Sequence, residues 1–422
     1  MDEKKQGLNS FGRKGWGIII YVGILYLISS ATVDLINVIP DTFNAVYGWD
    51  TNQMLVFSSV GGYVGVVLSL AIGRWVTHKG VKVPTIVMLF LMGIAFFLTG
   101  QVGSIAMYGA AIAILAAAGA TVNLVSTNAF MSNWFPKKKG VALGWATMGA
   151  PVSSAVSIPI FMIAFNASGG KIASPFIVFA VISIIVAVIT IICVKGTPEE
   201  AGTYPDNDPA EAGMVNINDY KSKWSVGKLL TCGQTWIVSL VFGFLFIALV
   251  ATMTQFIPRM MAAGFTQEEG TAWLSIAALL GIVGSYIWGV LDQKFGTKKI
   301  VIVFAAYMAI MQFALAATLH SNRTLSLVLT VFLGILIGGI CNLFPSMVIN
   351  IFGRYEFAAA NSVVTPIVSL IRTATFILMA GVLAATMGDF AKLSIVLGVI
   401  SVIALILSFF LSSKEIPAPG EN

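Results

Sequence analysis

The chain has 422 residues, of which 58% are hydrophobic and only 10% are charged. Soluble domains carry about 25% charged residues, and the mean hydropathy here is +0.92, which argues against a soluble enzyme, a disordered protein or a nucleic-acid binder. The three cysteines and two histidines show no metal-ligand or disulfide spacing. We therefore expect a polytopic membrane protein without a metal site or another cofactor.

Apolar stretches long enough to span a bilayer recur along the whole chain. A helix that crosses about 30 Å of hydrocarbon needs about 20 apolar residues, and no period-two alternation suggests strands instead. The first stretch is too long for the apolar region of a cleavable signal peptide. The twelve predicted spans are 16–39, 53–74, 83–102, 105–134, 140–165, 172–195, 233–257, 271–291, 299–319, 325–350, 357–387 and 392–413.

The basic residues predict the orientation of these spans. With both termini in the cytoplasm, 19 of the 24 Lys and Arg lie on the inner side and one, Arg372, lies within a span. The four outer cations are Lys171, Arg259, Arg323 and Lys392. Cytoplasmic loops are rich in Lys and Arg, so we expect a multi-pass protein of the cell membrane. The net charge of +6 is then a topology signal and not evidence for an acidic partner.

The chain divides into two similar halves. Residues 196–230 form the longest polar stretch, rich in Pro, Gly and acidic residues, with six spans on either side. We expect an N-terminal six-helix bundle at 1–196, a cytoplasmic central loop at 197–230 and a C-terminal six-helix bundle at 231–422.

A loop motif repeats between the halves. The sequence GRWVTHKGVK begins at Gly73 after the second span, and GVLDQKFGTK begins at Gly289 after the eighth, 216 positions later. A weaker match at an offset of 217 relates 133–137 to 350–354, and one at 218 relates 37–40 to 255–258. These matches predict a tandem duplication of a six-helix unit. The loop residues with a predicted gating role are Gly73, His78, Lys79, Gly80, Gly289, Lys294 and Gly296.

The duplicated six-helix unit with this loop motif resembles the major facilitator superfamily over nearly the whole chain. The resemblance implies an all-α fold of twelve transmembrane helices in two pseudo-symmetric halves. The family loop usually carries Asp where this sequence has Thr77 and Gln293, and Asp292 is a candidate to replace it in the second half. Two further stretches, NWFPKKKG from Asn133 and TPEEAGTYPD from Thr197, resemble the branch of oxalate/formate antiporters and monocarboxylate transporters.

A transporter of this kind binds its substrate near the bilayer midplane, between its halves. We expect the first, second, fourth and fifth spans and their repeat partners to line that cavity. A charge at the bilayer centre costs at least about 2.5–3.5 kcal/mol on insertion scales, so the two ionisable residues well inside spans, Asp34 and Arg372, are the leading site candidates.

Arg372 lies six residues after Pro366, which we expect to kink or loosen the eleventh span. Its guanidinium has a planar set of donors that suits a carboxylate, which predicts a substrate-binding residue. The alternative is that Arg372 only pairs with Asp34 or with backbone carbonyl groups. Antiporters of the resembling branch carry a further basic residue in the eighth span, and 271–291 has none. A single cation favours a monocarboxylate over a dicarboxylate.

Asp34 lies near the outer end of the first span and is the candidate proton-coupling residue. Its alternative is an ordinary, hydrated carboxylate at the outer mouth. Neutral polar residues are weaker candidates, because such side chains also join neighbouring helices in membranes. Those predicted to bind substrate are Asn123, Asn342, Gln255 and Asn361, with Asn128, Ser346 and Thr365 as further candidates.

These features predict a secondary active transporter of an organic monocarboxylate that works by proton symport or anion exchange and functions as a monomer. The bilayer, a small organic anion and a proton are the expected partners. The closest alternative is a proton-coupled drug antiporter of the same fold. An enzyme is not expected, because the intramembrane ionisable residues form no catalytic group, and the sequence contains no P-loop for ATP.

Overall fold

A computed structural model describes residues 10–209, 220 and 222–418. Within these residues the chain forms helices and no strand, as the sequence predicts. The first half contains α1 (Gly12–Asp34), η1 (Leu35–Asn37), α2 (Ile39–Tyr47), α3 (Thr51–Lys79), α4 (Lys82–Thr99), α5 (Ile105–Thr121), η2 (Val122–Ser126), α6 (Thr127–Trp134), α7 (Lys139–Ala146), α8 (Gly149–Ala167) and α9 (Ala173–Cys193). The remaining elements are η3 (Pro205–Asn207), α10 (Val226–Thr231), α11 (Gly233–Thr254), α12 (Phe256–Ala262), α13 (Gln267–Phe295), α14 (Thr297–Thr318), α15 (Arg323–Leu333), α16 (Leu336–Phe352), α17 (Phe357–Ala385) and α18 (Phe390–Ser408).

Twelve helical segments in the described residues are long and apolar enough to cross a membrane. They coincide with the predicted spans to within a few residues at most ends, and the fourth span, Ile105–Trp134, has the predicted bounds. The first, fourth, fifth and tenth spans are each built from more than one helical element. The eleventh span, by contrast, runs through Pro366 as one α-helix, α17. Proline therefore does not end that helix.

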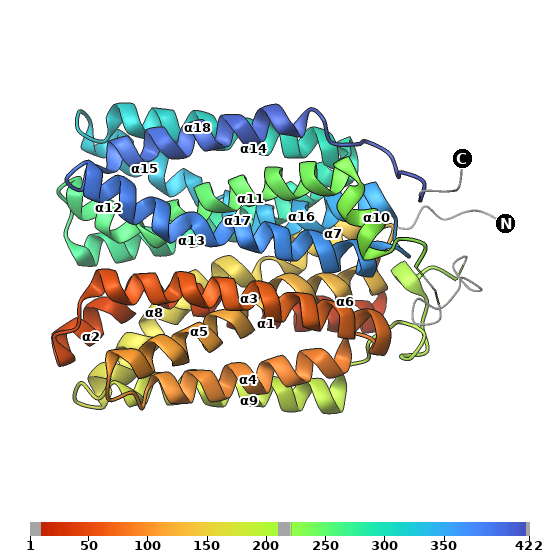
Figure 1. Cartoon of the computed structure of the whole chain (residues 1–422), viewed down its shortest axis with the longest axis horizontal. Helices are drawn as coiled ribbons and strands as arrows, with labels where there is room; N and C mark the ends of the chain where they lie inside the picture. The colour runs from red at the N-terminus through yellow and green to blue at the C-terminus, as the bar shows by residue number, and fades with distance from the viewer. Residues whose placement is uncertain (1–9, 210–219, 221, 419–422) are drawn as a thin grey trace.

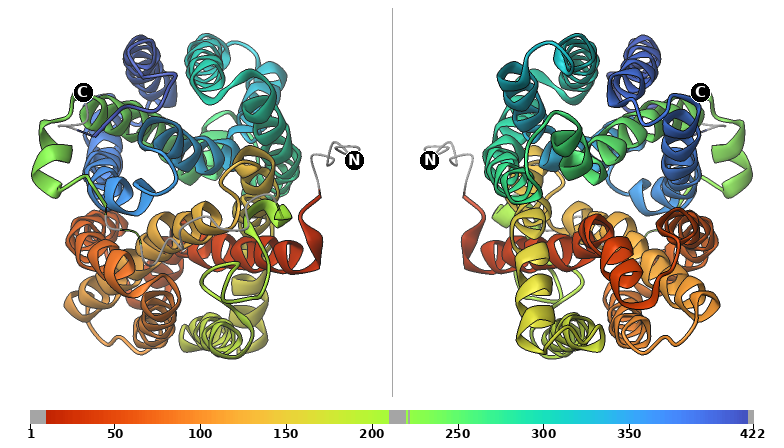
Figure 2. Two further views of the ribbon diagram at one scale, coloured as in Figure 1. Left: turned by 90° about the vertical axis from the view of Figure 1, so that its right-hand side faces the viewer. Right: turned by 90° about the vertical axis from the view of Figure 1, so that its left-hand side faces the viewer.

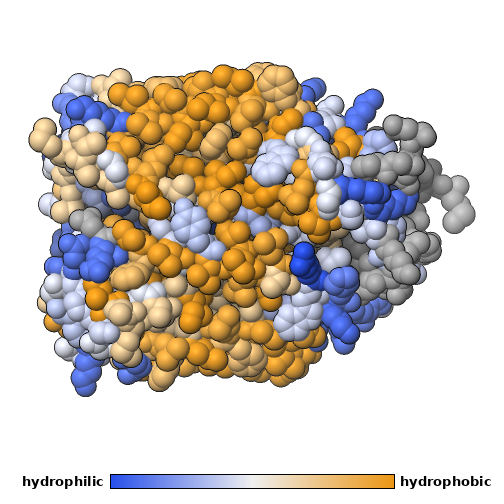
Figure 3. Space-filling model, viewed as in Figure 1, coloured by the Kyte–Doolittle hydropathy of each residue, from blue (hydrophilic) through white to orange (hydrophobic). Residues whose placement is uncertain are grey.

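The helices of the two halves lie in two bundles that face each other along their length (Figures 1 and 2). The start of α1, the loop before α10 and the segment after α18 lie together at one end, at the right of Figure 1. We call this the terminal end. Apolar side chains cover the middle of the molecule, and polar side chains gather at its two ends (Figure 3). Such a belt is the surface that a bilayer requires.

The repeated loop motif has the same structure in both halves. The second glycine of each motif, Gly80 or Gly296, follows the last residue of α3 or α13 with φ of +76° or +88°. A residue without Cβ is favoured there, because a positive φ is costly for other residues. The motif therefore ends each helix and turns the chain into the next span.

The first glycine of each motif lies where the halves meet. A Cβ on Gly73 would lie 3.1 Å from Cβ of Ser362, and one on Gly289 would lie 2.5 Å from the carbonyl oxygen of Gly140. The contact partner belongs to the opposite half in both cases. Small residues allow helix backbones to approach closely in membranes, so these glycines permit the two bundles to meet near the terminal end.

Candidate functional site

A cavity of about 160 Å³ lies between the two halves. Its lining comes from α1 with η1, α3, α5 with η2, and α8 of the first half, and from α11, α13, α16 and α17 of the second. These elements belong to the first, second, fourth, fifth, seventh, eighth, tenth and eleventh spans. The predicted set of cavity-lining spans is therefore confirmed.

The two walls of the cavity differ in chemistry. The first half contributes mostly small and polar side chains, and the second half contributes mostly large apolar ones around Arg372. The polar lining residues of the first half are Ser29, Ser30, Thr32, Asp34, Asn37, Ser58, Asn123 and Ser154. The large apolar residues of the second half are Phe246, Leu249, Val250, Met253, Leu274, Ile337, Ile340 and Phe376. Such a cavity suits a small molecule with a polar and an apolar side.

Asp34 is half-buried at the end of α1 and its carboxylate faces α8. Oδ2 accepts a hydrogen bond from Oγ of Ser153 at 2.6 Å, and Oδ1 accepts one from Oγ of Ser154 at 2.9 Å. Ser153 lies 3.0 Å from Oγ of Ser157. Hydroxyl groups rather than a cation therefore hold this carboxylate, and they can reorient if it takes up a proton.

Arg372 lies in the middle of α17, half-buried in the cavity wall. The carbon Cζ of its guanidinium lies 5.3 Å from the centre of the Phe246 ring, within the range of a cation–π contact. Its carbonyl oxygen accepts a hydrogen bond from Oγ1 of Thr375 at 2.5 Å. Arg372 is the only Lys or Arg among the described residues that line the cavity.

Asn123 reaches the same cavity from an irregular turn of the fourth span. Residues 122–126 form η2, a π-helical turn between α5 and α6. Nδ2 of Asn123 lies 3.0 Å from Oγ of Ser29 and 3.4 Å from Oγ of Ser30. Single π-helical turns are common at functional sites because they displace one side chain from the regular face of a helix. The structure thus brings Asp34, Arg372 and Asn123 together.

Three other predicted substrate-binding residues lie outside this cavity lining. Asn342 is fully buried in α16, and neither of its amide atoms has a hydrogen-bond partner. Asn361 on α17 donates from Nδ2 to the carbonyl oxygen of Leu124 at 3.5 Å, which joins the halves. Gln255 lies at the junction of α11 and α12. Asn361 therefore acts as a helix-to-helix contact, the alternative that the sequence left open for these polar residues.

The predicted gating residues lie near the terminal end and not in the cavity. The glycines have the two structural roles described above. His78, Lys79 and Lys294 are exposed in the last turns of α3 and α13. Asp292 is buried, and its Oδ2 accepts a hydrogen bond from Oγ of Ser346 at 2.5 Å.

Polar contacts close the path between the cavity and the terminal end. Tyr26, one helical turn from the cavity on α1, donates to Oδ1 of Asn128 at 3.1 Å and to the carbonyl oxygen of Cys341 at 3.5 Å. Nearer the terminal end, Nζ of Lys139 donates to the carbonyl oxygen of Ser346 at 2.9 Å. Tyr26 and Lys139 both bind residues of the other half. The described structure is therefore a state closed at the terminal end.

Sequence reasoning missed several of these residues. Ser153 and Ser154, the partners of Asp34, carry no sequence signal that separates them from the other serines of the spans.

Arg259 is assigned to the outer side by its position in the sequence alone. Its side chain is fully buried in α12 and donates from Nη1 to the carbonyl oxygen of Thr252 at 3.3 Å. Burial lowers the pKa of its guanidinium to about 10. No group of three metal-ligating side chains occurs among the described residues.

The sequence of residues 22–375 matches the family model of the Major Facilitator Superfamily. The chain belongs to the major facilitator superfamily. No curated protein matches the chain. The family match does not distinguish branches, so the resemblance to oxalate/formate antiporters and monocarboxylate transporters stays a prediction.

Solved structures of this superfamily share the fold. The proton:xylose symporter XylE, bound to 6-bromo-6-deoxy-D-glucose, is 12% identical, with a TM-score of 0.71 over 94% of this chain and 96% of that one. The E. coli fucose:proton symporter FucP is also 12% identical, with a TM-score of 0.66 over 94% and 98% of the two chains. At this identity these similarities show the fold of the chain and not its substrate.

Proposed function

We propose that the chain is a secondary active transporter that moves an organic monocarboxylate across the cell membrane by alternating access. The observation that carries the proposal is Arg372, a half-buried cation in the wall of a cavity between the two halves, which pairs with no carboxylate in the described structure. A guanidinium in that place can bind a carboxylate with two parallel hydrogen bonds. The absence of a second basic residue from the described lining favours one carboxylate over two.

The coupling mechanism follows from Asp34. It lines the same cavity as Arg372 and carries the opposite charge. The hydroxyl groups of its serine partners can hydrogen-bond to the carboxyl group whether or not it is protonated. Proton symport through Asp34 is supported by the fold that the chain shares with the proton symporters XylE and FucP. Exchange for a second anion is the alternative mode at the same cavity, and in that mode Asp34 keeps its charge throughout.

The two halves at 1–196 and 231–422 would rock about the cavity, with the central loop at 197–230 between them and both termini in the cytoplasm. Asn123 and the serines of α1 face the substrate from the first half, while Phe246 and Phe376 face it from the second. The apolar side of the cargo would lie against these rings and its carboxylate against Arg372. A monomer contains the whole site.

The test is uptake by the purified protein in liposomes. Labelled formate, acetate, lactate and pyruvate are compared with xylose, fucose and the cationic dye ethidium, with and without an inward proton gradient. We expect uptake of at least one monocarboxylate and of neither the sugars nor the dye. Acceleration by the gradient indicates symport, and uptake that requires a preloaded anion indicates exchange. Transport of a sugar or of ethidium without any carboxylate would contradict the proposal.

A further inference from the structure

The two sequence stretches that resemble one transporter branch lie against each other at the terminal end. Asp206, the last residue of the second stretch, is buried with only 1% of its surface exposed. Its Oδ2 and Oδ1 accept hydrogen bonds from the backbone N–H groups of Lys137 and Lys138, both at 2.8 Å. One carboxylate therefore holds the loop between α6 and α7 in place.

Residues 196–208, here called the strap, are fixed to the first half by more than this carboxylate. Nζ of Lys138 donates to the carbonyl oxygen of Ser10 at 2.9 Å and to that of Asp206 at 3.2 Å. Nζ of Lys14, on the first turn of α1, donates to the carbonyl oxygen of Ala201 at 2.5 Å. The strap is thus attached to the first half.

The second half contacts the loop that Asp206 holds and the last turn of α6. Nη2 of Arg354 donates to the carbonyl oxygen of Asn133 at 3.2 Å, and Nε2 of Gln293 donates to the carbonyl oxygen of Lys137 at 3.1 Å. The N–H of Lys138, which Asp206 also binds, belongs to the same peptide group as this carbonyl of Lys137. A shift of this peptide would displace the acceptor of Gln293 directly.

Arg354 also faces the strap itself. Its side chain is 8% exposed, and its Nη2 lies 4.0 Å from Oε1 of Glu199. Burial raises the pKa of the Asp206 carboxyl, while the hydrogen bonds from the loop and then the charges of Lys138 and Arg354 act in the opposite direction. Arg354 therefore lies among the carboxylates of the strap and the carbonyl groups of the loop.

The other end of the central loop is fixed to the second half instead. Glu356, two residues after Arg354, accepts hydrogen bonds from the hydroxyl of Tyr220 at 2.8 Å and from the backbone N–H of Lys223 at 2.9 Å, and also from Oγ of Ser222. Each end of the central loop is thus attached to its own half. Contacts such as those of Arg354 with the loop and the strap cross between the halves.

We propose that Asp206 is a positioning residue of the transport cycle, which holds residues 133–138 (the end of α6 and the loop before α7) and the strap as a preformed receptor for Arg354. The docked Arg354 keeps the terminal end closed, and its release accompanies opening of that end. Neither residue lines the cavity. The proposal requires that the chain alternates between two states, but it does not require that the cargo is a carboxylate.

The test uses Cys341, which lines the cavity, as a reporter of opening at the terminal end. Cys193 and Cys232 are replaced with Ser, and the protein is placed in liposomes selected so that the termini face outward. The rate at which a membrane-impermeant maleimide labels Cys341 is measured for the parent, Asp206→Asn, Arg354→Gln and the double variant. Glu356→Gln is the matched control, because it weakens the attachment of the central loop to the second half without removing a contact between halves.

We expect Asp206→Asn and Arg354→Gln each to raise the labelling rate about tenfold, which is the effect of one lost charge-assisted hydrogen bond. The double variant should label no faster than the faster single variant, since both act through one contact. Glu356→Gln should label at the parent rate. A general loss of structure would instead lower the melting temperature and give additive effects.

Parent-like labelling of folded Asp206→Asn and Arg354→Gln would overturn the proposal, as would equal acceleration by Glu356→Gln. If Asp206→Asn does not fold, Arg354→Gln alone decides, because it tests directly whether the docked arginine keeps the terminal end closed. The labelling needs no substrate. A failure of carboxylate uptake therefore leaves this result intact, and a failure here leaves the proposed function intact.

Discussion

Asp34 and Arg372 line one cavity from opposite halves, and in the described structure no ion pair or hydrogen bond joins them. The carboxylate accepts from two serines, and the guanidinium lies over a phenylalanine ring. Each charge carries a desolvation cost, which an opposite charge would offset if the two were paired. Keeping them apart leaves each free for another partner, which in the proposed function is the substrate for Arg372 and a proton for Asp34.

The first prediction concerns the cation of the cavity. Arg372→Gln should raise the KM for the carried monocarboxylate about 10- to 100-fold, because a hydrogen bond to a charged group contributes about 1.5–3 kcal/mol. Arg372→Lys should fall between that variant and the parent, since it keeps the charge and loses the planar pair of donors. Initial uptake rates in liposomes give the values. Arg323→Gln, an exposed arginine outside the cavity, is the control and should leave KM unchanged.

The second prediction concerns proton coupling. Asp34→Asn has nearly the shape of the parent side chain but cannot carry a proton through the cycle. Uptake by this variant should no longer respond to an inward proton gradient, while exchange of labelled for unlabelled substrate persists. Parallel measurements of net uptake and of exchange separate the two. Retention of gradient-driven uptake in Asp34→Asn would show that the proton travels elsewhere.

The third prediction tests the close approach of α1 and α8. A Cβ on Gly149 would lie 1.9 Å from the carbonyl oxygen of Gly23, so the backbones must separate to admit it. Gly149→Ala should reduce the free energy of unfolding by about 1–3 kcal/mol, the usual cost of overpacking. Gly17→Ala is the control, because no atom lies within 4 Å of its added Cβ. That variant should be neutral or slightly more stable in thermal melting, since alanine favours helix over glycine.

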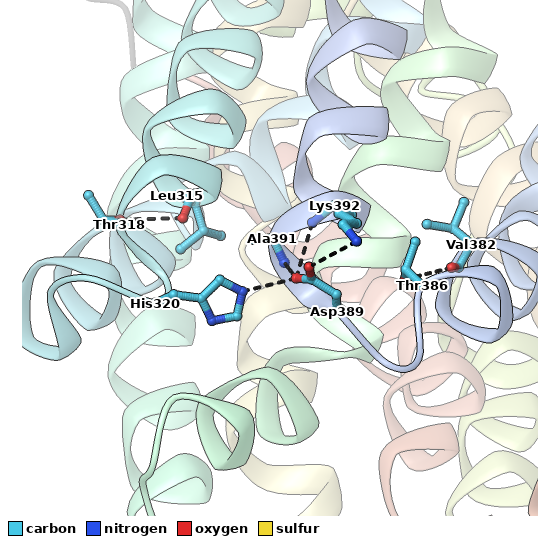
Figure 4. Close-up of polar contacts among 8 residues, drawn as sticks. All are labelled: Leu315, Thr318, His320, Val382, Thr386, Asp389, Ala391 and Lys392. Atoms are coloured by element: carbon cyan, nitrogen blue, oxygen red, sulfur yellow. Dashed lines mark hydrogen bonds and ion pairs between the residues drawn. The ribbon is translucent and has the colours of Figure 1, made fainter.

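The fourth prediction concerns Asp389 at the end opposite the terminal end. Its Oδ1 lies 3.0 Å from Nε2 of His320 and accepts from the backbone N–H groups of Ala391 and Lys392 at 2.9 and 3.4 Å (Figure 4). The hydrogen bond from His320, more than any other contact, holds the pKa of this carboxyl below its usual value. Asp389→Ala removes the cap of α18 and should cost about 1 kcal/mol.

Asp389→Asn is the matched variant, because asparagine still caps a helix but carries no charge. A lowered pKa in the folded state means that the charge adds stability above the ordinary pKa of aspartate, about 4, and that this gain is lost as pH falls through the lower folded value. The melting temperatures of parent and Asp389→Asn should therefore differ near neutral pH and converge in acid. The gap should be small, since the pair is exposed. A gap that widens in acid would refute this account.

The sequence predicted the spans and the two halves, because hydropathy and repeat register depend on position along the chain. The cavity-lining helices followed from the family resemblance. It did not predict which side chains meet. The partners of Asp34 lie 119 and 120 residues away, on a helix whose rotation no pattern reveals. The π-helical turn that places Asn123 leaves no mark in the composition. Among the predicted polar residues, only contacts in three dimensions separate Asn123 from Asn361.

The sequence also did not predict the surroundings of the charged side chain of Arg259. Counting cations assigns it correctly to the segment after the seventh span, but the count does not say where the side chain points. The structure buries it completely in α12. Asp206 is an acidic residue in a polar loop, and composition alone would place it in solvent. The structure instead buries it, and its carboxylate accepts hydrogen bonds from the backbone N–H groups of Lys137 and Lys138.

The most direct test of the central claim is the binding of a monocarboxylate and of its primary amide to the purified protein. The amide has nearly the same shape but no charge. Calorimetry with acetate and acetamide, and with lactate and lactamide, compares the parent with Arg372→Gln. We expect the parent to bind at least one acid and neither amide, and Arg372→Gln to bind that acid at least about tenfold more weakly. Equal binding of acid and amide, or undiminished binding by Arg372→Gln, would contradict a carboxylate site at Arg372.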